Sequence, residues 1–325
     1  MKEKIKKQLL KNPTLYQKSA YIYTLFFHRN RLMKRKSFGK KNPNNTVLLI
    51  RPNAEDGIQG LLSLVAETLR WVDYADKKQF IPIVDYKNFS TQYGNNIDNA
   101  WDYYFKQPSS LTLKDAYQSE NVVFSGVTKK PVLDLRLFSG EIFRNQNILN
   151  ESRRIAQSRL VLMDDVQQIV NRENRVIHVE GCIGVFIRGT DYTRLKPTGE
   201  YVQPAIGQLI DKIKEFSKKY GEKSIFLVTE DDIYYQELVE NFGDRVRTVS
   251  YDSFIQNYTD DVFLSESNCL EKNKKERGMK YLVKIILLSK CKYLISSIAK
   301  GSIMAYLLNE KKYEDEFIFD LGVYK

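Results

Sequence analysis

Residues 182–192 read CIGVFIRGTDY, and this stretch decides how the second half of the chain folds. Its first six residues form an apolar run with the length and composition of a buried strand. The run stops at Arg188, and Gly189, Thr190 and Asp191 follow directly. A buried strand that ends by presenting a guanidinium and then a carboxylate predicts a polar site at that end of the strand.

Strands alternate with helices of ten or more residues from this point onward. The predicted strands are 182–188, 223–232, 245–252 and 293–297, and the predicted helices are 203–221, 233–244, 277–292 and 300–312. Such alternation predicts a parallel sheet with helices on both faces. Ligands of these sheets bind beyond the carboxyl ends of the strands, which is where Arg188 is expected.

The first half begins with a similar pattern. A strand over 46–53, a helix over 58–72 and a strand over 80–86 make a predicted β-α-β unit. Gly57 and Gly60 stand at the start of the helix, where small residues let a ligand or a neighbouring strand approach the backbone. We take both glycines as candidate acceptor-side residues, and tight helix–strand packing explains them equally well.

Residues 90–150 are less regular, and their main feature is an aromatic cluster around Trp101. Aromatic faces stack on sugar rings, so Trp101 is a candidate acceptor-side residue, while a core role for the cluster stays open. A single helix is predicted from Glu151 to about Arg172, before the second domain begins.

The length of the chain points to two domains. It has 325 residues, 42% of them hydrophobic, and a single core rarely grows beyond about 250–300 residues. The sequence has no GxGxxG after a strand and no GxxxxGK[ST]. Dinucleotide oxidoreductases and P-loop NTPases are therefore disfavoured.

The formal net charge of +11 is concentrated at the N-terminus. Residues 1–41 hold 13 Lys and Arg and one acid, which leaves 38 of the 51 bases and 39 of the 40 acids to the rest of the chain. Because the body is nearly neutral, a nucleic-acid-binding protein is disfavoured.

We predict that residues 1–45 form a basic amphipathic helical arm that ends in a turn-rich linker at 39–45. Its longest apolar stretch, 21–27, is far shorter than the ~20 residues of a membrane span, and it lacks the pattern of a secretory signal. A basic helix with aromatic residues is typical of an anchor on an anionic membrane surface. A solvated helix packed on the body and a partner-binding arm stay open. We expect a cytoplasmic protein, peripheral at the inner face of the membrane.

The cysteines and histidines exclude two kinds of site. Cys182, Cys269 and Cys291 are too few and too scattered for a disulfide framework or a zinc site. With only His28 and His178 in the chain, a His-based metal cluster is excluded. We therefore expect reduced cysteines and no zinc or His-based metal site.

Polar groups stand at three predicted strand ends. They are Arg188 with Asp191, the run Thr229, Glu230 and Asp231, and Ser297. Lys300, Gly301 and Ser302 open the last helix, where free N–H groups, an ammonium and a hydroxyl suit a phosphate. Arg188 offers a permanently charged fork to the same anion. A purely structural pairing of Arg188 with Asp191 or Glu230 is the alternative.

The motifs GVFIRGTDY, GEYVQP, IFLVTEDD and LLSKCKYLISSIAKGSIMA, in this order, resemble those of the fucosyltransferase superfamily that includes the α1,6- and protein O-fucosyltransferases. The resemblance is clearest over residues 180–310. It implies an inverting, metal-independent enzyme of the GT-B fold, an α/β architecture of two Rossmann-like domains facing a central cleft. It also implies GDP-fucose as donor, bound mainly by the C-terminal domain.

The resemblance also implies roles for individual residues. Arg188 matches the arginine that grips the β-phosphate and helps the nucleotide to leave, and Asp191 matches the acid beside it. Glu200 falls near the carboxylate proposed as base in the α1,6 enzymes. The donor-binding positions that match are Thr229, Glu230, Asp231, Ser297, Lys300, Gly301 and Ser302. Asp191 and Glu200 both stay candidates for the base.

The chain departs from the family pattern at three positions. Phe186 stands in place of a histidine, Gly189 in place of a second arginine, and Lys284 in place of an acid associated with the nucleotide base. A UDP-sugar donor on the same fold is therefore kept as an alternative.

We predict an arm over 1–45, an N-terminal acceptor domain over 46–175 and a C-terminal nucleotide-sugar domain over 176–325. The predicted function is transfer of a sugar from a nucleotide diphosphate, with GDP-fucose favoured, to a glycan or lipid-linked oligosaccharide in surface-polysaccharide synthesis. No cofactor or metal is expected. A non-catalytic membrane-surface scaffold with a vestigial cleft is the alternative from another class.

Overall fold

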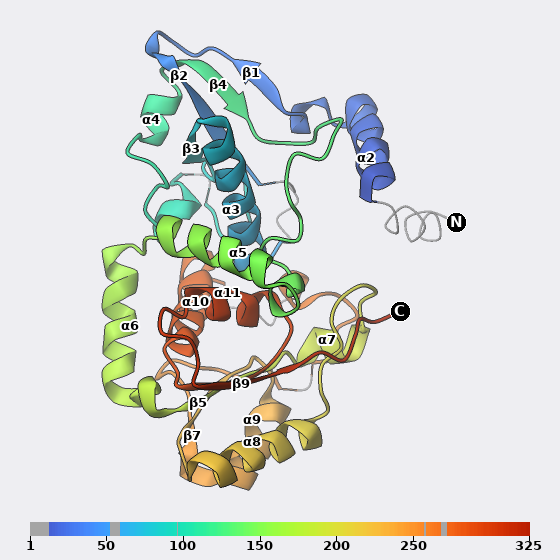
Figure 1. Cartoon of the computed structure of the whole chain (residues 1–325), viewed down its shortest axis with the longest axis vertical. Coiled ribbons are helices and arrows are strands. Elements are labelled where there is room, and N and C mark those ends of the chain that lie inside the picture. The colour runs from blue at the N-terminus through green and yellow to red at the C-terminus, as the bar shows by residue number, and fades with distance from the viewer. Residues whose placement is uncertain (1–12, 53–58, 96, 257, 268–271) are drawn as a thin grey trace. The chain divides into compact units, whose positions relative to one another are not determined.

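A computed structural model describes residues 13–52, 59–95, 97–256, 258–267 and 272–325. The described chain divides into two compact units (Figure 1). The first comprises the described residues up to Gln59 together with Ser63–Leu137 and Arg159–Val161; the second comprises Gly60–Leu62, Phe138–Ser158 and the described residues from Leu162 onward.

The second unit contains a five-stranded sheet in which every neighbouring pair is parallel. Its order is β7 (Val246–Arg247), β6 (Ile225–Val228), β5 (Ile183–Phe186), β8 (Tyr293–Ser297) and β9 (Asp315–Phe319). The pairing sets Val185 opposite both Leu227 and Ile295. The predicted parallel sheet is confirmed, with β9 as a strand that the sequence had not indicated.

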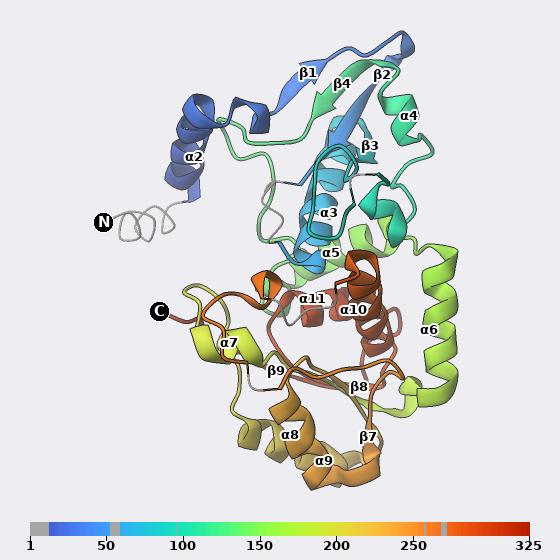
Figure 2. The ribbon, with the colours of Figure 1, turned by 180° about the vertical axis from the view of Figure 1, so that it is seen from behind.

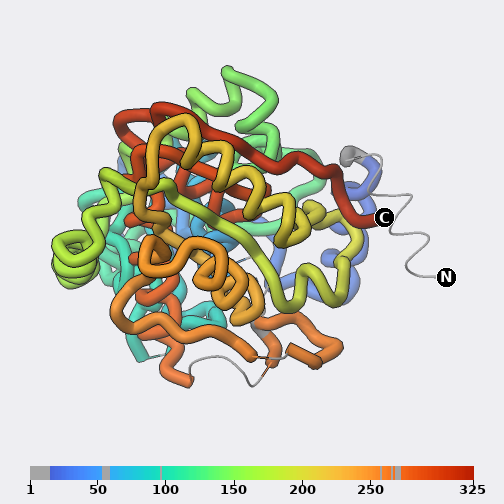
Figure 3. Tube along the Cα trace, turned by 90° about the horizontal axis from the view of Figure 1, so that it is seen from below, coloured from blue at the N-terminus to red at the C-terminus, as the bar shows by residue number. Residues whose placement is uncertain are grey.

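Helices cover both faces of this sheet, as predicted. In the described part of the chain these helices are α8 (Ile206–Tyr220), α9 (Asp232–Phe242), α10 (Lys274–Ser289) and α11 (Lys300–Leu308). Figures 1 and 2 show α8 and α9 on one side and α10 and α11 on the other, and the view from below in Figure 3 has α8 and α9 in front.

Strand β5 shows how its alternating side chains divide between the two helical layers. Ile183 and Val185 belong to the apolar cluster that α8 and α9 complete. Gly184 and Phe186 point the other way, because a Cβ added at Gly184 would lie 2.8 Å from Leu288 of α10, and Phe186 lies against Gly301 of α11. Both faces of β5 are therefore buried, which is why its sequence is continuously apolar.

The strand order makes the carboxyl end of β5 the topological switch point of the sheet. From β5 the chain proceeds to β6 and β7 on one side, then returns to form β8 and β9 on the other. The helices that leave β5 and β8 therefore depart to opposite sides, which opens a crevice at this point in doubly wound sheets. Arg188 follows β5 by two residues.

The first unit has its own four-stranded sheet, in the order β1 (Lys34–Lys36), β4 (Ser119–Phe124), β2 (Lys41–Ile50) and β3 (Ile81–Val84). Strand β2 is parallel to β3 and β4, and β1 is antiparallel. Helix α3 (Leu61–Lys78) joins β2 to β3, so the predicted β-α-β unit is confirmed. The short helix α4 (Leu113–Ala116) adds Ala116 to a buried apolar cluster that includes Val47, Leu49 and Val122.

The N-terminal segment is less separate from the body than predicted. Residues 13–27 form helix α2 (Pro13–Phe27), but β1 and the start of β2 belong to the sheet. The expected linker at 39–45 is therefore wrong from Lys41 onward. Its turn residues make an irregularity inside the strand: Asn42 has φ 51°, and the pairing with β4 shifts register between Lys41 and Thr46. None of the described helices is both long and apolar enough to span a bilayer.

Two helices replace the single one predicted over 151–172. They are α5 (Gln146–Arg159) and α6 (Asp164–Ile177). Between them the carbonyl of Val161 accepts a hydrogen bond from Lys106, and Asp164 and Asp165 stand in the first turn of α6, where acids favour a helix start.

The compact units divide the chain near residue 137, earlier than the domain boundary that we expected between 175 and 176. Helix α5 accounts for much of this difference. Its Arg153 and Gln157 donate hydrogen bonds to the carbonyls of Tyr306 and Leu307 at the end of α11. These bonds tie α5 to the second unit.

The remaining elements are short. They are α7 (Thr190–Leu195) and the 3-10 helices Arg29–Arg31, Ala100–Tyr103, Gly140–Phe143, Val179–Gly181, Gly243–Arg245 and Leu264–Glu266. Helix α7 begins directly after Arg188 and Gly189 and so belongs to the region beyond β5.

Candidate functional site

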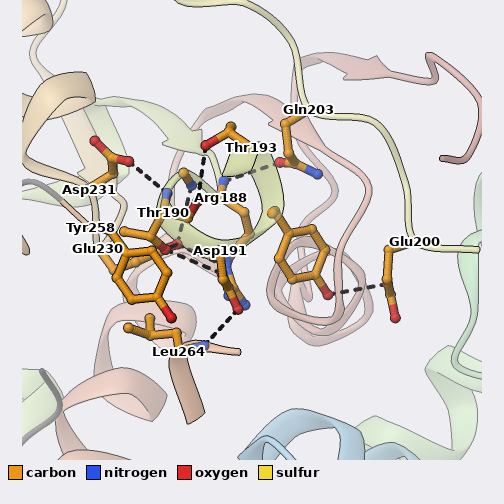
Figure 4. A network of polar contacts seen from close by, with 12 residues as sticks. Arg188, Thr190, Asp191, Thr193, Glu200, Gln203, Glu230, Asp231, Tyr258 and Leu264 are labelled. Atoms are coloured by element: carbon orange, nitrogen blue, oxygen red, sulfur yellow. Dashed lines mark hydrogen bonds and ion pairs between the residues drawn. The ribbon is translucent and has the colours of Figure 1, made fainter. Parts of the chain in front are cut away.

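Arg188 is held between two carboxylates beyond the end of β5 (Figure 4). Its Nη2 donates to Asp191 Oδ1 at 2.8 Å and its Nε donates to Glu230 Oε1 at 3.0 Å. Its backbone N–H donates to Gln203 Oε1 at 3.2 Å. The guanidinium is therefore fixed in position before any ligand binds.

The charge of Arg188 is secured by these partners. Burial alone would lower its pKa, but Glu230 and Asp191 outweigh burial and hold the pKa well above its ordinary value. The side chain remains 22% exposed. Among the described residues, no group accepts a hydrogen bond from its Nη1. A fixed, permanently charged fork with one unused donor group can bind an anion.

The ring of Tyr192 supports the guanidinium from one side. The ring centre lies 4.4 Å from the central carbon of Arg188, and the Tyr192 hydroxyl donates to Glu200 Oε2 at 3.2 Å. Burial raises the pKa of this hydroxyl above its usual value, Arg188 opposes the rise, and Glu200 adds to it. Tyr192 therefore stays protonated and links Arg188 to Glu200.

Asp191 is a buried carboxylate whose oxygens are both engaged. Oδ1 accepts from Arg188 and from the hydroxyl of Thr190, and Oδ2 accepts from the backbone N–H of Leu264 at 3.0 Å. The residue is 2% exposed. Asp191 thus ties Arg188 to the segment around Leu264, and its geometry suits a positioning residue more than a base that must reach a substrate.

Glu200 differs from Asp191 in both respects. It is exposed, and its side chain accepts only from Tyr192 within the described residues. One carboxylate oxygen is therefore open to solvent and to an incoming hydroxyl. Of the two candidates for the base, Glu200 has the accessible geometry.

The acidic end of β6 organises the turn that follows β5. Glu230 Oε1 accepts from the backbone N–H of Gly189 and from the hydroxyl of Thr190 as well as from Arg188. Asp231 Oδ2 accepts from the Thr190 backbone N–H at 2.7 Å, and its other oxygen caps the first turn of α9. The Thr229 hydroxyl accepts from the backbone N–H of Asp231. Glu230 and Asp231 therefore fix the position of residues 188–190, which we call the arginine loop.

The backbone at Thr190 is strained. Its φ is 38°, a left-handed conformation that a β-branched residue rarely adopts. The bonds to Asp231 and Glu230 compensate the strain. Strained residues of this kind cluster at functional sites, so the strain supports a functional role for the loop.

Gly189 has room for no side chain, because an added Cβ would lie 2.2 Å from Oδ2 of Asp231. We expect Gly189→Ala to displace Asp231 and to lower the free energy of unfolding by about 1–3 kcal/mol. Gly207→Ala, in α8 and with open space around the added Cβ, is the matched control and should change stability by no more than about 1 kcal/mol, in the stabilising direction. Urea denaturation measures both, and equal stabilities of Gly189→Ala and wild type would contradict the steric explanation.

Gln203 joins the ends of β5 and β8. Its Oε1 accepts from the Arg188 backbone and from the hydroxyl of Ser297, the latter at 2.5 Å. Ser297 is fully buried. Two of the three strand ends predicted to converge, those of β5 and β8, are therefore connected by one side chain.

Residues 300–302 at the start of α11, which were predicted to bind a phosphate, each contact other parts of the protein. The hydroxyl of Ser302 donates to the backbone at Ser297, and Gly301 packs so tightly that an added Cβ would lie 2.3 Å from the ring of Phe186. Close packing thus explains why residue 301 is glycine, and the hydrogen bond to Ser297 explains the hydroxyl at Ser302. Lys300 Nζ donates to the carbonyl of Phe138 at 2.8 Å, and the first-turn N–H groups of α11 are those that a helix leaves without an intrahelical partner.

Two of the three predicted acceptor-side residues, Trp101 and Gly60, lie in the described part of the chain. Trp101 is 2% exposed, with its indole N–H bonded to the carbonyl of Lys106 and its ring packed on Phe105. The sugar-stacking hypothesis for Trp101 is therefore corrected: the aromatic cluster is core. Gly60 is exposed, with open space where a Cβ would be, and Gly57 lies outside the described residues.

Lys284 has an acidic partner rather than a ligand. Its Nζ donates to Asp252 Oδ1 at 2.7 Å, and both side chains are largely buried. The departure from the family pattern at this position therefore forms an ion pair between α10 and the segment after β7. No group of three or more His, Cys, Asp and Glu side chains is placed to hold a metal in the described part of the chain.

Sequence reasoning missed four contributors to the site. They are Thr190, Tyr192, Gln203 and the backbone of Leu264. Tyr192 and Gln203 lie inside the quoted motifs, so position alone could have drawn attention to them. Leu264 carries no such signal, because its contribution is a backbone N–H from a distant segment.

No protein-family model matches the chain, and no curated protein matches it by sequence. The structure is similar to that of the NodZ alpha-1,6-fucosyltransferase soaked with GDP-fucose, at 14% identity over 85% of this chain and 96% of that one, with a TM-score of 0.52. Fucosyltransferase NodZ from Bradyrhizobium gives 14% identity, the same coverage and a TM-score of 0.51.

POFUT1 in complex with GDP-fucose is similar over 87% of this chain and 100% of that one, at 9% identity and a TM-score of 0.50. At such identities the likeness concerns the fold. The chain has a fucosyltransferase-like fold, and the resemblance inferred from the motifs is confirmed at that level.

Proposed function

We propose that this chain is an inverting, metal-independent glycosyltransferase that moves a sugar, with GDP-fucose the favoured donor, to a hydroxyl of an acceptor glycan. The fold supports the general class, because structures with this fold include fucosyltransferases with GDP-fucose. The proposal rests mainly on the position of Arg188, which is fixed at the switch point of the parallel sheet and whose Nη1 has no acceptor in the described part of the chain.

The charge at this point sets a requirement for donor binding. Arg188, Asp191 and Glu230 together carry a net charge of −1, so Arg188 alone does not make the region attractive to a diphosphate. Further positive potential is needed. Lys300 and the N-terminus of α11 are the groups that we propose for it, because α11 follows β8, the strand beside β5.

Glu230 keeps one oxygen for the donor in this proposal. Its Oε1 accepts all three bonds from the arginine loop, while Oε2 has no partner among the residues that the structure describes. Oε2 can accept a hydrogen bond from a sugar hydroxyl of the donor. Four other predicted donor-binding side chains form hydrogen bonds within the protein and so hold the backbone of the site in place. They are Thr229, Asp231, Ser297 and Ser302.

The chemistry requires a base and a leaving-group stabiliser. Glu200 takes the proton of the acceptor hydroxyl while that oxygen bonds to the anomeric carbon from the face opposite the diphosphate. The bond from the anomeric carbon to the diphosphate oxygen breaks, and its electron pair stays on the diphosphate. Arg188 and Lys300 stabilise the charge that develops there.

A UDP-sugar donor is the alternative within the same class. It rests on Lys284, which replaces the acid that the resemblance associates with the nucleotide base and is paired with Asp252. A non-catalytic scaffold with a vestigial cleft is the alternative from another class. Measurements of GDP and UDP binding distinguish both alternatives from the main proposal.

Thermal unfolding with nucleotides tests the proposal. At a GDP concentration 100 times its Kd, binding adds about 2.7 kcal/mol to stability, which should raise Tm by roughly 5–10 °C for a unit of this size. Guanosine, which lacks the diphosphate, is the control and should give a far smaller shift. A larger shift with UDP would move the donor to the alternative, and no shift with either nucleotide would support the scaffold.

The acceptor remains the glycan or lipid-linked oligosaccharide of a surface polysaccharide in this proposal. An inner-membrane-face location would bring the enzyme to such an acceptor. Support for it comes from the N-terminal segment.

A further inference from the structure

Helix α2 exposes a broad apolar face. Six large side chains on it are between 37% and 71% exposed: Leu15, Tyr16, Ile22, Tyr23, Phe26 and Phe27. At 3.6 residues per turn they cover an arc of about 140° on the same side of the helix. Thr24, away from this arc, is buried. The outward side of α2 is therefore its most hydrophobic side, which is the reverse of an ordinary surface helix.

A dense positive charge follows this face directly in the chain. Residues 29–41 contain seven Lys and Arg and no acid. All three residues of β1, Lys34, Arg35 and Lys36, are exposed. Edge strands often carry charges that prevent pairing with other chains, and this explains the three residues of β1. It leaves the apolar face of α2 unexplained.

We propose that α2 and residues 29–41 dock on the headgroup region of an anionic lipid bilayer. The aromatic and aliphatic side chains would enter the boundary between headgroups and acyl chains, and the basic residues would lie at the anionic surface. Neither feature suffices alone, because exposed apolar side chains without charge bind membranes weakly and charge without them is released by salt. The inference does not depend on the proposed transferase activity.

Charge argues against the other possible occupants. A second copy of the chain would bring its own seven bases next to these, and like charges oppose such pairing. A nucleic acid would satisfy the bases but would leave Phe26 and Phe27 exposed to water. An anionic bilayer satisfies both at once.

Vesicle binding of the full chain tests the proposal. We expect co-sedimentation with vesicles of phosphatidylcholine and 30% phosphatidylglycerol, as a concrete composition, and much less with phosphatidylcholine alone. Phe26→Ser/Phe27→Ser should weaken binding to the anionic vesicles at least about tenfold. Lys34→Gln/Arg35→Gln should weaken it about thirtyfold at low salt, since each base near the surface contributes roughly one factor of five.

The matched control is Val176→Ser on α6, which removes an apolar side chain of similar exposure, 70% against 70% for Phe27. It should bind vesicles as wild type does, and thermal unfolding should confirm that every variant is folded. Absence of binding to anionic vesicles would overturn the proposal, as would binding that both double variants leave unchanged. Self-association or oligonucleotide binding that the Phe26→Ser/Phe27→Ser variant abolishes, without vesicle binding, would assign the face to another partner.

Discussion

Replacing Arg188 by alanine should reduce the rate of sugar transfer by at least about a thousandfold. The guanidinium is fixed at the switch point of the sheet, and within the described residues its Nη1 has no hydrogen-bond acceptor. Removing a single cationic or N–H group that stabilises developing phosphate charge costs about 10²–10⁵ in rate. Steady-state transfer assays with GDP-fucose, run well below Tm, measure the effect.

Stability must be followed alongside activity for this variant. Asp191 would lose the partner of a buried ion pair, and breaking such a pair costs up to about 3–5 kcal/mol. Arg188→Lys keeps the charge and spares more of the fold, yet it loses the planar fork and should still lose about a hundredfold in rate. Arg154→Ala, which removes an exposed arginine paired with Glu151 on α5, is the control and should retain full activity. Activity of Arg188→Ala close to that of wild type would exclude the proposed role.

The second large effect on transfer is expected from substitution of the proposed base, Glu200. Glu200→Gln should lower kcat by about 10²–10⁴ while leaving the free energy of unfolding within about 0.5 kcal/mol of wild type, because Glu200 is exposed. Asp191→Asn should behave differently. Because Asp191 is buried, this substitution weakens a charged hydrogen bond to Arg188 in the protein interior. It should lower the free energy of unfolding by about 1.5–3 kcal/mol.

A comparison of the two variants separates base from positioning residue. Glu240→Gln, an exposed carboxylate on α9, is the matched control and should change neither rate nor stability. Glu200→Asp, which keeps a carboxylate, should recover part of the lost activity. If Asp191→Asn stays as stable as wild type and loses more kcat than Glu200→Gln, the base is Asp191.

The alternating pattern of the second half was sufficient to predict its fold. Strands β5 and β6 are short, continuously apolar and bounded by turn or polar residues, and α8, α9 and α10 are long enough to cross a sheet. Such a pattern leaves few topologies open. The central position of β5, which makes Arg188 important, could not be predicted, because sequence order does not fix strand order.

The errors in the first half have identifiable physical causes. Asn42 and Pro43 are turn formers, yet the strand absorbs them as a register shift beside β4. The break between α5 and α6 has no Gly or Pro to announce it. Trp101 was an ambiguous residue, because a large aromatic side chain serves a core and a sugar site equally well, and only its burial decides.

The candidate site was partly predictable for a similar reason. Residues that lie at strand ends, such as Arg188 and Glu230, are found from the sheet pattern, and the structure brings them into contact. The hydrogen bonds between these residues could be assigned only from the structure. The sequence left Asp191 and Glu200 equal as bases, and the difference between a buried and an exposed carboxylate separates them.

A crystal structure of the chain with GDP tests the central claim most directly. We expect the diphosphate beyond the carboxyl end of β5, with phosphate oxygens within hydrogen-bond distance of the Arg188 guanidinium. Saturation of the protein should first be established by calorimetry. GDP bound elsewhere on the chain, with no phosphate oxygen near Arg188, would contradict the claim.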